Sequence, residues 1–213
     1  MIETGSVRLF VAVWPSAEVI STLANLPRSS GPHIRWTTPE QWHVTLYFLG
    51  DLSSYAAGVA TRRFFSIERE IVKNSLLPTT AQVGPVTGCF GNSILFVPVE
   101  GLDTLAVTVN RTFKQRASSR TSRGRKTNPD EGGRGKDNEV GNNRPRDCES
   151  KEKHFVGHIT LARGRGTKTN LTYLAGRPVT ARWGVDTLTL VESTLSQRGA
   201  LYKILGEIPL RSS

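Results

Sequence analysis

The chain contains the segment His43-Val44-Thr45-Leu46 and repeats its pattern at His158-Ile159-Thr160-Leu161. Each copy lies in a run of apolar and β-branched residues, which is typical of a β-strand. Side chains alternate between the two faces of a strand, so the histidine and threonine of each copy share one face while the two apolar residues point into a core. The repeat therefore predicts two similar β-rich halves, each presenting an imidazole and a hydroxyl toward one groove.

The remaining sequence carries both strand and helix patterns. Helical periodicity covers residues 17–26, 53–73 and 101–115, and Ser16 fits the N-cap of the first helix. Residues 88–92 have turn composition, and the apolar run at 94–99 indicates a central strand. Together these patterns predict an α+β fold, with strands at 7–14, 33–37, 42–49, 76–86, 94–99, 155–163, 178–183, 185–192 and 200–209.

Residues 117–153 differ from the rest because apolar side chains almost vanish there. Such a segment cannot bury enough surface to offset the entropy of ordering, so we expect a disordered insertion within a single domain of residues 1–213. The formal net charge of +10 favours polyanionic partners such as RNA, DNA or anionic lipid. Six of the positive charges lie in residues 114–126 without an intervening acid. That basic cluster fits either a solvated arm or an RNA-binding one.

The chain shows no pattern typical of membrane insertion or secretion. No apolar run approaches the roughly 20 residues that span a bilayer, and the first residues lack the basic start of a signal peptide. We therefore expect a monomeric cytoplasmic protein without a membrane partner. Cys89 and Cys148 match neither a disulfide framework nor a metal knuckle, and we expect both to be free thiols.

Two imidazoles and two hydroxyls around one ligand suit the cleavage of a phosphodiester. In-line displacement needs one group to accept a proton from the nucleophile and another to donate one to the leaving oxygen. Histidine titrates near neutral pH, so one imidazole of the pair can be neutral and the other charged. The threonine hydroxyls can donate hydrogen bonds to the phosphate oxygens. The repeat thus predicts His43 and His158 as catalytic groups and Thr45 and Thr160 as phosphate ligands.

A metal site is the rival use of paired histidines. Such a site needs three or more protein ligands, and neither repeat contains an acid. His33 lies on another predicted strand and His154 borders the polar insertion, so both are expected to be structural or solvent-exposed. We expect no catalytic metal and no cofactor.

Four segments occur in an order that matches a known family. They are Arg8-Leu9-Phe10-Val11-Ala12-Val13-Trp14-Pro15, Arg35-Trp36, His43-Val44-Thr45-Leu46-Tyr47-Phe48-Leu49-Gly50 and Gly157-His158-Ile159-Thr160-Leu161-Ala162-Arg163. With these segments the sequence resembles the bacterial RNA 2′,3′-cyclic phosphodiesterases, also called 2′-5′ RNA ligases, of the 2H phosphoesterase superfamily. The resemblance covers residues 7–115 and 155–210.

The resemblance implies two lobes related by a pseudo-twofold axis, each a small antiparallel sheet with outer helices, and an active-site cleft between them. It implies hydrolysis of a terminal 2′,3′-cyclic phosphate on RNA to a 2′-phosphate, with His43 as the proton donor to O3′ and His158 as the acceptor that activates water. An RNA 5′-hydroxyl in place of water would give 2′-5′ ligation.

The resemblance also implies two further substrate contacts. Simple strand alternation puts Arg163 on the face of Leu161, so this residue reaches the substrate only if the strand twists or ends there. Phe48 fits either a stacking platform for a base or a core position. The sequence leaves two other functions open, a non-enzymatic basic RNA-binding protein and a 2H phosphodiesterase acting on another small cyclic nucleotide. The basic segment lacks aromatic residues between Phe113 and Phe155, which disfavours the binding protein.

Overall fold

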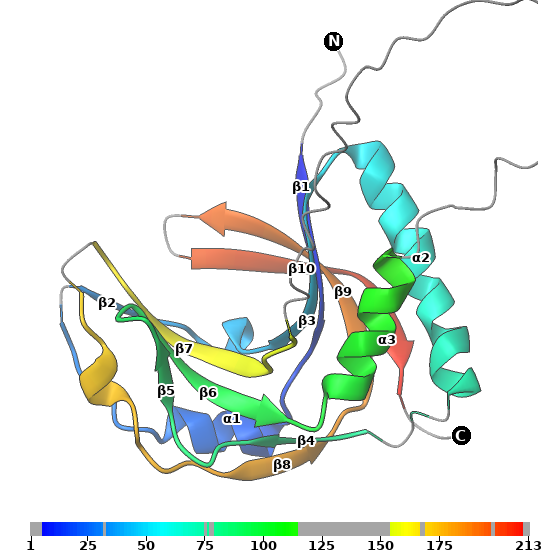
Figure 1. The fold of residues 1–213 in the computed structure, drawn as a ribbon. Helices are drawn as coiled ribbons and strands as arrows, with labels where there is room; N and C mark the ends of the chain where they lie inside the picture. The colour runs from blue at the N-terminus through cyan, green and yellow to red at the C-terminus, as the bar shows by residue number, and fades with distance from the viewer. Residues whose placement is uncertain are drawn as a thin grey trace, which may run out of the picture. The chain divides into compact units, whose positions relative to one another are not determined.

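The computed structural model describes residues 6–31, 33–74, 76, 79–114, 154–166, 169–196 and 199–210. The predicted insertion at 117–153 and Cys148 lie outside these residues. All described residues except His154 belong to one compact unit, drawn in Figure 1. No helix among the described residues is long and apolar enough to cross a bilayer.

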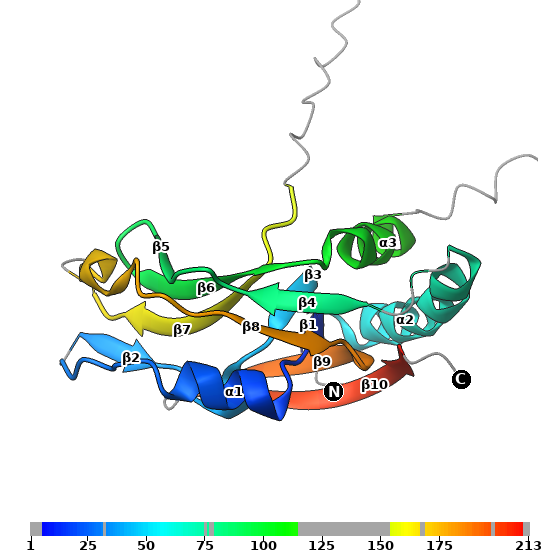
Figure 2. The ribbon, with the colours of Figure 1, turned by 90° about the horizontal axis from the view of Figure 1, so that it is seen from below.

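The first lobe is an antiparallel sheet of four strands in the order β10-β9-β1-β3. Two helices, α2 (Ser54–Lys73) and α3 (Asp103–Lys114), pack against each other and against β10 and β3 respectively. Figure 2 shows both helices beside this sheet. The strands are β1 (Val7–Val13), β3 (Val44–Leu52), β9 (Thr187–Ser196) and β10 (Gly199–Pro209).

The second lobe is an antiparallel sheet in the order β2-β7-β6-β4-β8, with β5 also paired to β6. Helix α1 (Ala17–Ala24) begins at the N-cap Ser16 and packs against β8. The strands are β2 (Ile34–Trp36), β4 (Thr80–Val83), β5 (Gly88–Phe90), β6 (Ile94–Glu100), β7 (His158–Gly164) and β8 (Ala181–Gly184). Two 3₁₀ turns complete the unit, η1 (Pro39–Gln41) and η2 (Thr172–Leu174).

Each lobe takes strands from both ends of the chain. Strands β1 and β3 form a sheet with β9 and β10, whereas β2, which lies between β1 and β3 in sequence, pairs with β7 of the other sheet (Figure 1). The lobes are therefore not simply the two sequence halves. Because the chain crosses between the sheets, the segment Trp36–Val44 links the partner strand of β7 in one lobe directly to β3 of the other.

The apolar residues of the two repeats enter a common core, as strand alternation predicts. Val44, Leu46, Ile159 and Leu161 are all buried in one cluster that also contains Trp42. This packing fixes which face of β3 and β7 is left for the histidines and threonines.

Some predicted boundaries are wrong. The composition of residues 88–92 predicted only a turn, but Gly88–Phe90 forms β5, with the turn after it. A Cβ at Gly88 would lie 2.6 Å from the Phe96 ring, so glycine allows the two strands to pack closely. Strand β3 continues through Gly50 to Leu52 instead of ending there, and β4 occupies only Thr80–Val83 of the predicted 76–86.

Candidate active site

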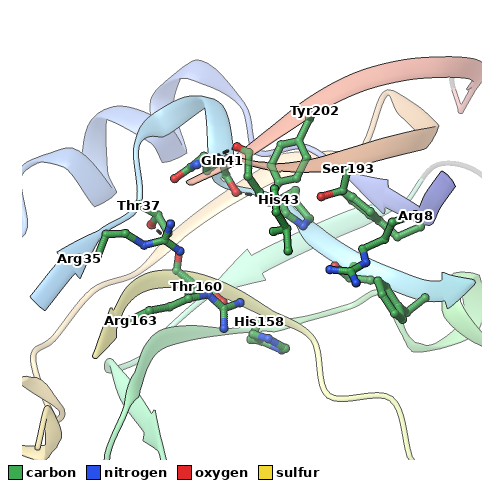
Figure 3. Close-up of a pocket in the computed structure, with 15 residues that line it drawn as sticks. Arg8, Arg35, Thr37, Gln41, His43, His158, Thr160, Arg163, Ser193 and Tyr202 are labelled. Carbon is green, nitrogen blue, oxygen red and sulfur yellow. Dashed lines mark hydrogen bonds between the residues drawn. The ribbon is translucent and has the colours of Figure 1, made fainter. Parts of the chain in front are cut away.

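A cavity of about 470 Å³ is lined by residues of both sheets (Figure 3). It contains all six residues that the sequence singled out for catalysis or substrate binding. They are His43, Thr45, Phe48, His158, Thr160 and Arg163. His43 directly precedes β3 and His158 begins β7, so the two histidines reach the cavity from different lobes. The structure thus brings together the two copies of the repeat.

Each copy of the repeat has a β-bulge at its fourth residue. In β7, Thr160 pairs with Phe96 and Ala162 pairs with Leu95, which leaves Leu161 without an opposite residue in β6. In β3, Thr45 pairs with Ala12 and Tyr47 pairs with Val11, so Leu46 is the additional residue. A bulge places two consecutive residues on one face and shifts the alternation of all that follow.

The bulges explain how Arg163 and Phe48 reach the cavity. Simple alternation put Arg163 on the core face of Leu161, but Leu161 and Ala162 are both buried and Arg163 returns to the cavity face. Phe48 occupies the corresponding position after the first repeat and is 59% exposed, so the core interpretation of Phe48 is wrong. The fifth residue after each histidine therefore faces the ligand space, and a strand twist or end at Arg163 is not needed.

Both imidazoles are held by the same backbone contact. Nδ1 of His43 lies 2.8 Å from the carbonyl oxygen of Gln41, and Nδ1 of His158 lies 2.8 Å from that of Val156. A carbonyl oxygen can only accept, so Nδ1 carries the hydrogen in both rings. Each neutral imidazole then has an unprotonated Nε2 on the side away from its carbonyl partner. The pair is oriented to take or give protons at Nε2.

His43 sits in an aromatic enclosure. Its ring stacks on Phe10 at 4.8 Å between centroids and meets Trp14 at 5.4 Å and Tyr202 edge-on at 5.1 Å. Burial is the main cause that lowers the pKa of His43 to about 4. The positive charges of His158 and Arg163 also lower this pKa, whereas the hydrogen bond to Gln41 raises it. In these surroundings His43 is therefore neutral at pH 7.

His158 has a more open setting. Its ring meets the edges of Phe90 and Phe96 at 5.0 and 5.8 Å, and these two rings stack on each other at 3.9 Å. The preceding residue, Gly157, brings the chain close to β6, because a Cβ there would clash with the carbonyl oxygen of Val99. Glycine at this position thus allows His158 to start β7 beside its neighbour strand.

The link between the lobes supplies residues that the sequence did not single out. The Thr37 hydroxyl lies 2.7 and 2.8 Å from the carbonyl oxygens of Thr160 and Leu161 and accepts a hydrogen bond from Trp42 Nε1 at 2.9 Å. Gln41 is the end of η1 and donates from Nε2 to the carbonyl of Ala200 at 2.9 Å. Thr37 therefore holds the bulge of the second repeat, while Gln41 orients His43 of the first.

Three arginines line the cavity, Arg8, Arg35 and Arg163, and the lining contains no aspartate or glutamate among the described residues. Arg8 forms a two-pronged ion pair with Asp51, at 3.0 and 3.1 Å. Arg35 and Tyr202 were missed as site residues in the sequence, since an arginine or tyrosine on a strand carries no signal of which side it faces. The site is cationic and suits an anionic ligand.

The other histidines and the described cysteine stay apart from this cavity. His33 and His154 are both exposed and do not line the cavity. Within the described ranges, no three His, Cys, Asp or Glu side chains gather into a group that could hold a metal ion. Cys89 lies in β5 as a half-buried free thiol.

Comparison with solved structures identifies proteins of the same fold. No protein-family model matches the sequence, and neither does any curated protein sequence. Among solved structures, TT0787 of Thermus thermophilus matches with a TM-score of 0.63 and 23% identity, covering 96% of this chain and 98% of that one. LigT of E. coli complexed with 3′-AMP matches with a TM-score of 0.59 and 17% identity, covering 98% and 100%. The chain shares its fold with LigT.

A third structure, described as a phosphoesterase, has a TM-score of 0.62 and 17% identity, with coverage of 98% and 100%. These alignments extend over nearly the whole of each chain. They confirm the expected α+β fold of two antiparallel sheets with outer helices. At these identities the likeness carries the fold and not the activity, which has to be argued from the site.

Proposed function

We propose that this protein is a 2H phosphoesterase that hydrolyses the 2′,3′-cyclic phosphate at the end of an RNA to a 2′-phosphate without a metal ion. One observation carries the proposal. The two His-x-Thr repeats line one cavity, and both imidazoles are fixed through Nδ1 so that Nε2 remains for the ligand. The E. coli LigT structures support a phosphate ligand in this fold, since they hold 3′-AMP, NADP⁺, phosphate and ATP.

In the proposed reaction, His158 accepts a proton from water through Nε2 as the water oxygen attacks phosphorus. The bond from phosphorus to O3′ breaks, and His43 donates a proton to O3′ through Nε2. Thr45 and Thr160 donate hydrogen bonds to the non-bridging oxygens, and the Arg163 guanidinium balances their charge. An RNA 5′-hydroxyl in the place of water would yield a 2′-5′ linkage through the same groups.

The donor role of His43 depends on the substrate. Without an anion beside it, the pKa of His43 is about 4, so this imidazole is neutral. An anionic phosphate bound beside the ring favours its charged form and raises the pKa. His43 then gains the proton that it donates only when a substrate is bound, which keeps the charged imidazole out of its aromatic enclosure at other times.

The direct test is hydrolysis of a short RNA with a 2′,3′-cyclic phosphate end, in the presence of EDTA. The product should be the 2′-phosphate, as resolved by phosphorus NMR. His43→Ala and His158→Ala should each lower kcat/KM by about 10²–10⁴-fold. His33→Ala is the matched control, because His33 is exposed outside the cavity and its loss should leave the rate unchanged.

Three results would count against the proposal. Retained activity in either cavity variant would remove the two-histidine mechanism, and loss of activity in EDTA would show a metal requirement. Hydrolysis of nucleoside cyclic phosphates with none of RNA ends would favour a 2H phosphodiesterase for another small cyclic nucleotide.

A further inference from the structure

Among the described residues, two of the three cavity arginines form no ion pair with a carboxylate. Arg8 is paired with Asp51, whereas neither ion pair found among the described residues involves Arg35 or Arg163. The described lining of the cavity itself has no carboxylate. The uncompensated positive charge of the cavity therefore lies on the side formed by β2 and β7.

Arg35 and Arg163 are direct neighbours. They are paired residues of the antiparallel strands β2 and β7, and both line the cavity. Directly opposite residues in such a pair have Cβ atoms about 5 Å apart, and like charges there destabilise the sheet. Figure 3 shows the two side chains reaching from the same side toward the space between the histidines. This arrangement costs stability on its own, and a bound anion would offset that cost.

The two arginines do not serve the same point of the cavity. The positive charge of Arg163 lowers the pKa of His43, and the charges of Arg163 and Arg35 both act on Tyr202. The Arg35 guanidinium lies against Gly199, where a Cβ would be 3.0 Å from Nη1. Arg163 is thus next to the catalytic pair, and Arg35 lies one strand farther, at the start of β10.

The number of negative charges on the ligand also distinguishes Arg163 from Arg35. A cyclic phosphate diester carries one negative charge, which Arg163 beside the histidines already matches. Arg35 adds a second positive charge about one strand spacing, roughly 5 Å, away from Arg163. A ligand with only the cyclic phosphate would leave Arg35 uncompensated.

We infer that Arg35 forms a subsite for a second phosphate group, so that the site binds terminal nucleotides carrying a 5′-phosphate or a 5′-phosphodiester in addition to the reacting phosphate. The inference rests on the proposed function for the identity of the reacting group. It adds a requirement for at least two phosphates, and it makes Arg35 a residue that distinguishes an RNA end from a free nucleoside cyclic phosphate.

Binding can be measured without catalysis, by calorimetry with adenosine 3′-phosphate and adenosine 3′,5′-bisphosphate as probes. The wild type should bind the bisphosphate about 10-fold or more tightly than the monophosphate, which is the range of a charge-assisted hydrogen bond. Arg35→Gln should weaken the bisphosphate far more than the monophosphate and so reduce this ratio to near one. Arg163→Gln should weaken both probes.

Arg165→Gln is the matched control. Arg165 is an exposed arginine two residues beyond Arg163 and does not line the cavity, so its loss tests the effect of net charge alone. It should keep the wild-type ratio. The melting temperature of Arg35→Gln should be equal to or above that of the wild type, because the substitution removes a like-charge pair.

Hydrolysis supplies a second measurement, with a nucleoside 2′,3′-cyclic phosphate, its 5′-phosphorylated form and a dinucleotide as substrates. Arg35→Gln should lower kcat/KM for the last two by about 10-fold or more relative to the first. An unchanged affinity ratio in Arg35→Gln, or an equal loss for both probes, would overturn the subsite. Absence of hydrolysis with the affinity ratio intact would instead overturn the proposed function alone.

Discussion

The two copies of the His-x-Thr repeat share a backbone and differ in their surroundings. In both, Nδ1 lies 2.8 Å from a carbonyl oxygen two residues earlier, and a bulge follows at the fourth residue. His43, however, is enclosed by Phe10, Trp14 and Tyr202, while the ring contacts of His158 among the described residues are T-shaped ones with Phe90 and Phe96. The backbone contact that both copies share orients the two imidazoles in the same way. The surrounding side chains differ, so the two imidazoles have different chemical properties.

This inequality matters because a pair of identical histidines has no preferred direction for proton flow. Aromatic burial depresses the pKa of His43 and so couples its protonation to the arrival of a negative ligand. Different environments around two like groups commonly separate an acid from a base in an enzyme site. Changing one histidine at a time tests that separation.

The largest expected effect comes from changing the leaving group. A p-nitrophenolate leaves without needing a proton, so a diester carrying it does not require the general acid. If His43 is the donor, His43→Ala should lose about 10²–10⁴-fold in kcat/KM on an RNA cyclic phosphate but little on the nitrophenyl diester. His158→Ala should lose activity on both substrates. Parallel rate measurements on the two substrates check this.

The opposite pattern would be equally informative. If His158→Ala were the variant rescued by the good leaving group, His43 would be the base, in agreement with its neutral state when no anion lies beside it. Equal losses for both variants on both substrates would show that the two environments do not divide the roles.

The second prediction concerns stability and pH. Above pH 6.5, the ordinary pKa of a histidine, His43 is neutral in both the folded and the unfolded chain. Between pH 6.5 and about 4 the unfolded chain binds a proton at this residue and the folded chain does not. The free energy of unfolding should therefore fall as the pH falls through this window, by about 2 kcal/mol from this group between about pH 7 and about pH 4.5. Urea denaturation at about pH 7 and about pH 4.5 measures it.

Carboxylates also titrate in that window, so the informative quantity is the difference between wild type and His43→Gln. The variant should lose part of the acid sensitivity. His33→Gln, at an exposed position, should keep the wild-type dependence. Identical pH dependence in wild type and His43→Gln would show that the enclosure does not depress the His43 pKa.

The structure also shows how far the sequence could predict this site. The period-two pattern of each repeat predicted that Val44 and Ile159 enter the core and that the histidines and threonines line a groove. Those residues depend only on their own strand, and all occupy the predicted side. The repeat alone predicted two sequence halves, which the strand pairing does not follow, and the two-lobed arrangement was implied by the family resemblance.

Residues that depend on pairing between strands could not be predicted in this way. A bulge depends on the pairing of two strands. The sequence of β7 alone therefore could not predict that Arg163 returns to the cavity face. Arg35 faces Arg163 because β2 joins the sheet of β7, a pairing between segments far apart in sequence. Thr37 was missed because its role is to bond to the backbone of the other repeat.

The third prediction tests the contacts of Thr37 with β7 and Trp42. Thr37→Val keeps the volume of the side chain but removes the donor to the carbonyls of Thr160 and Leu161 and the acceptor for Trp42. Leaving such buried groups unpaired should lower the free energy of unfolding by about 2 kcal/mol, measured by urea denaturation. Thr61→Val is the control, because the Thr61 hydroxyl donates only to the carbonyl oxygen of Ala57 one turn earlier in α2. This variant should change stability by less. Equal effects would show that Thr37 is only a packing residue.

The smallest expected effect concerns Phe48, which takes the place in the first lobe that Arg163 takes in the second. Phe48 is 59% exposed, so a base stacked on it keeps much of its other face in water. Phe48→Ala should therefore raise KM for an RNA end by about 5-fold, near 1 kcal/mol at the low end for aromatic stacking, and leave kcat unchanged. Tyr55→Ala, an exposed aromatic on α2 outside the cavity, is the control. Arg163→Gln should lower kcat as well as weaken binding, so a fall in kcat for Phe48→Ala would contradict the assignment of the nucleobase to one lobe and the phosphate charge to the other.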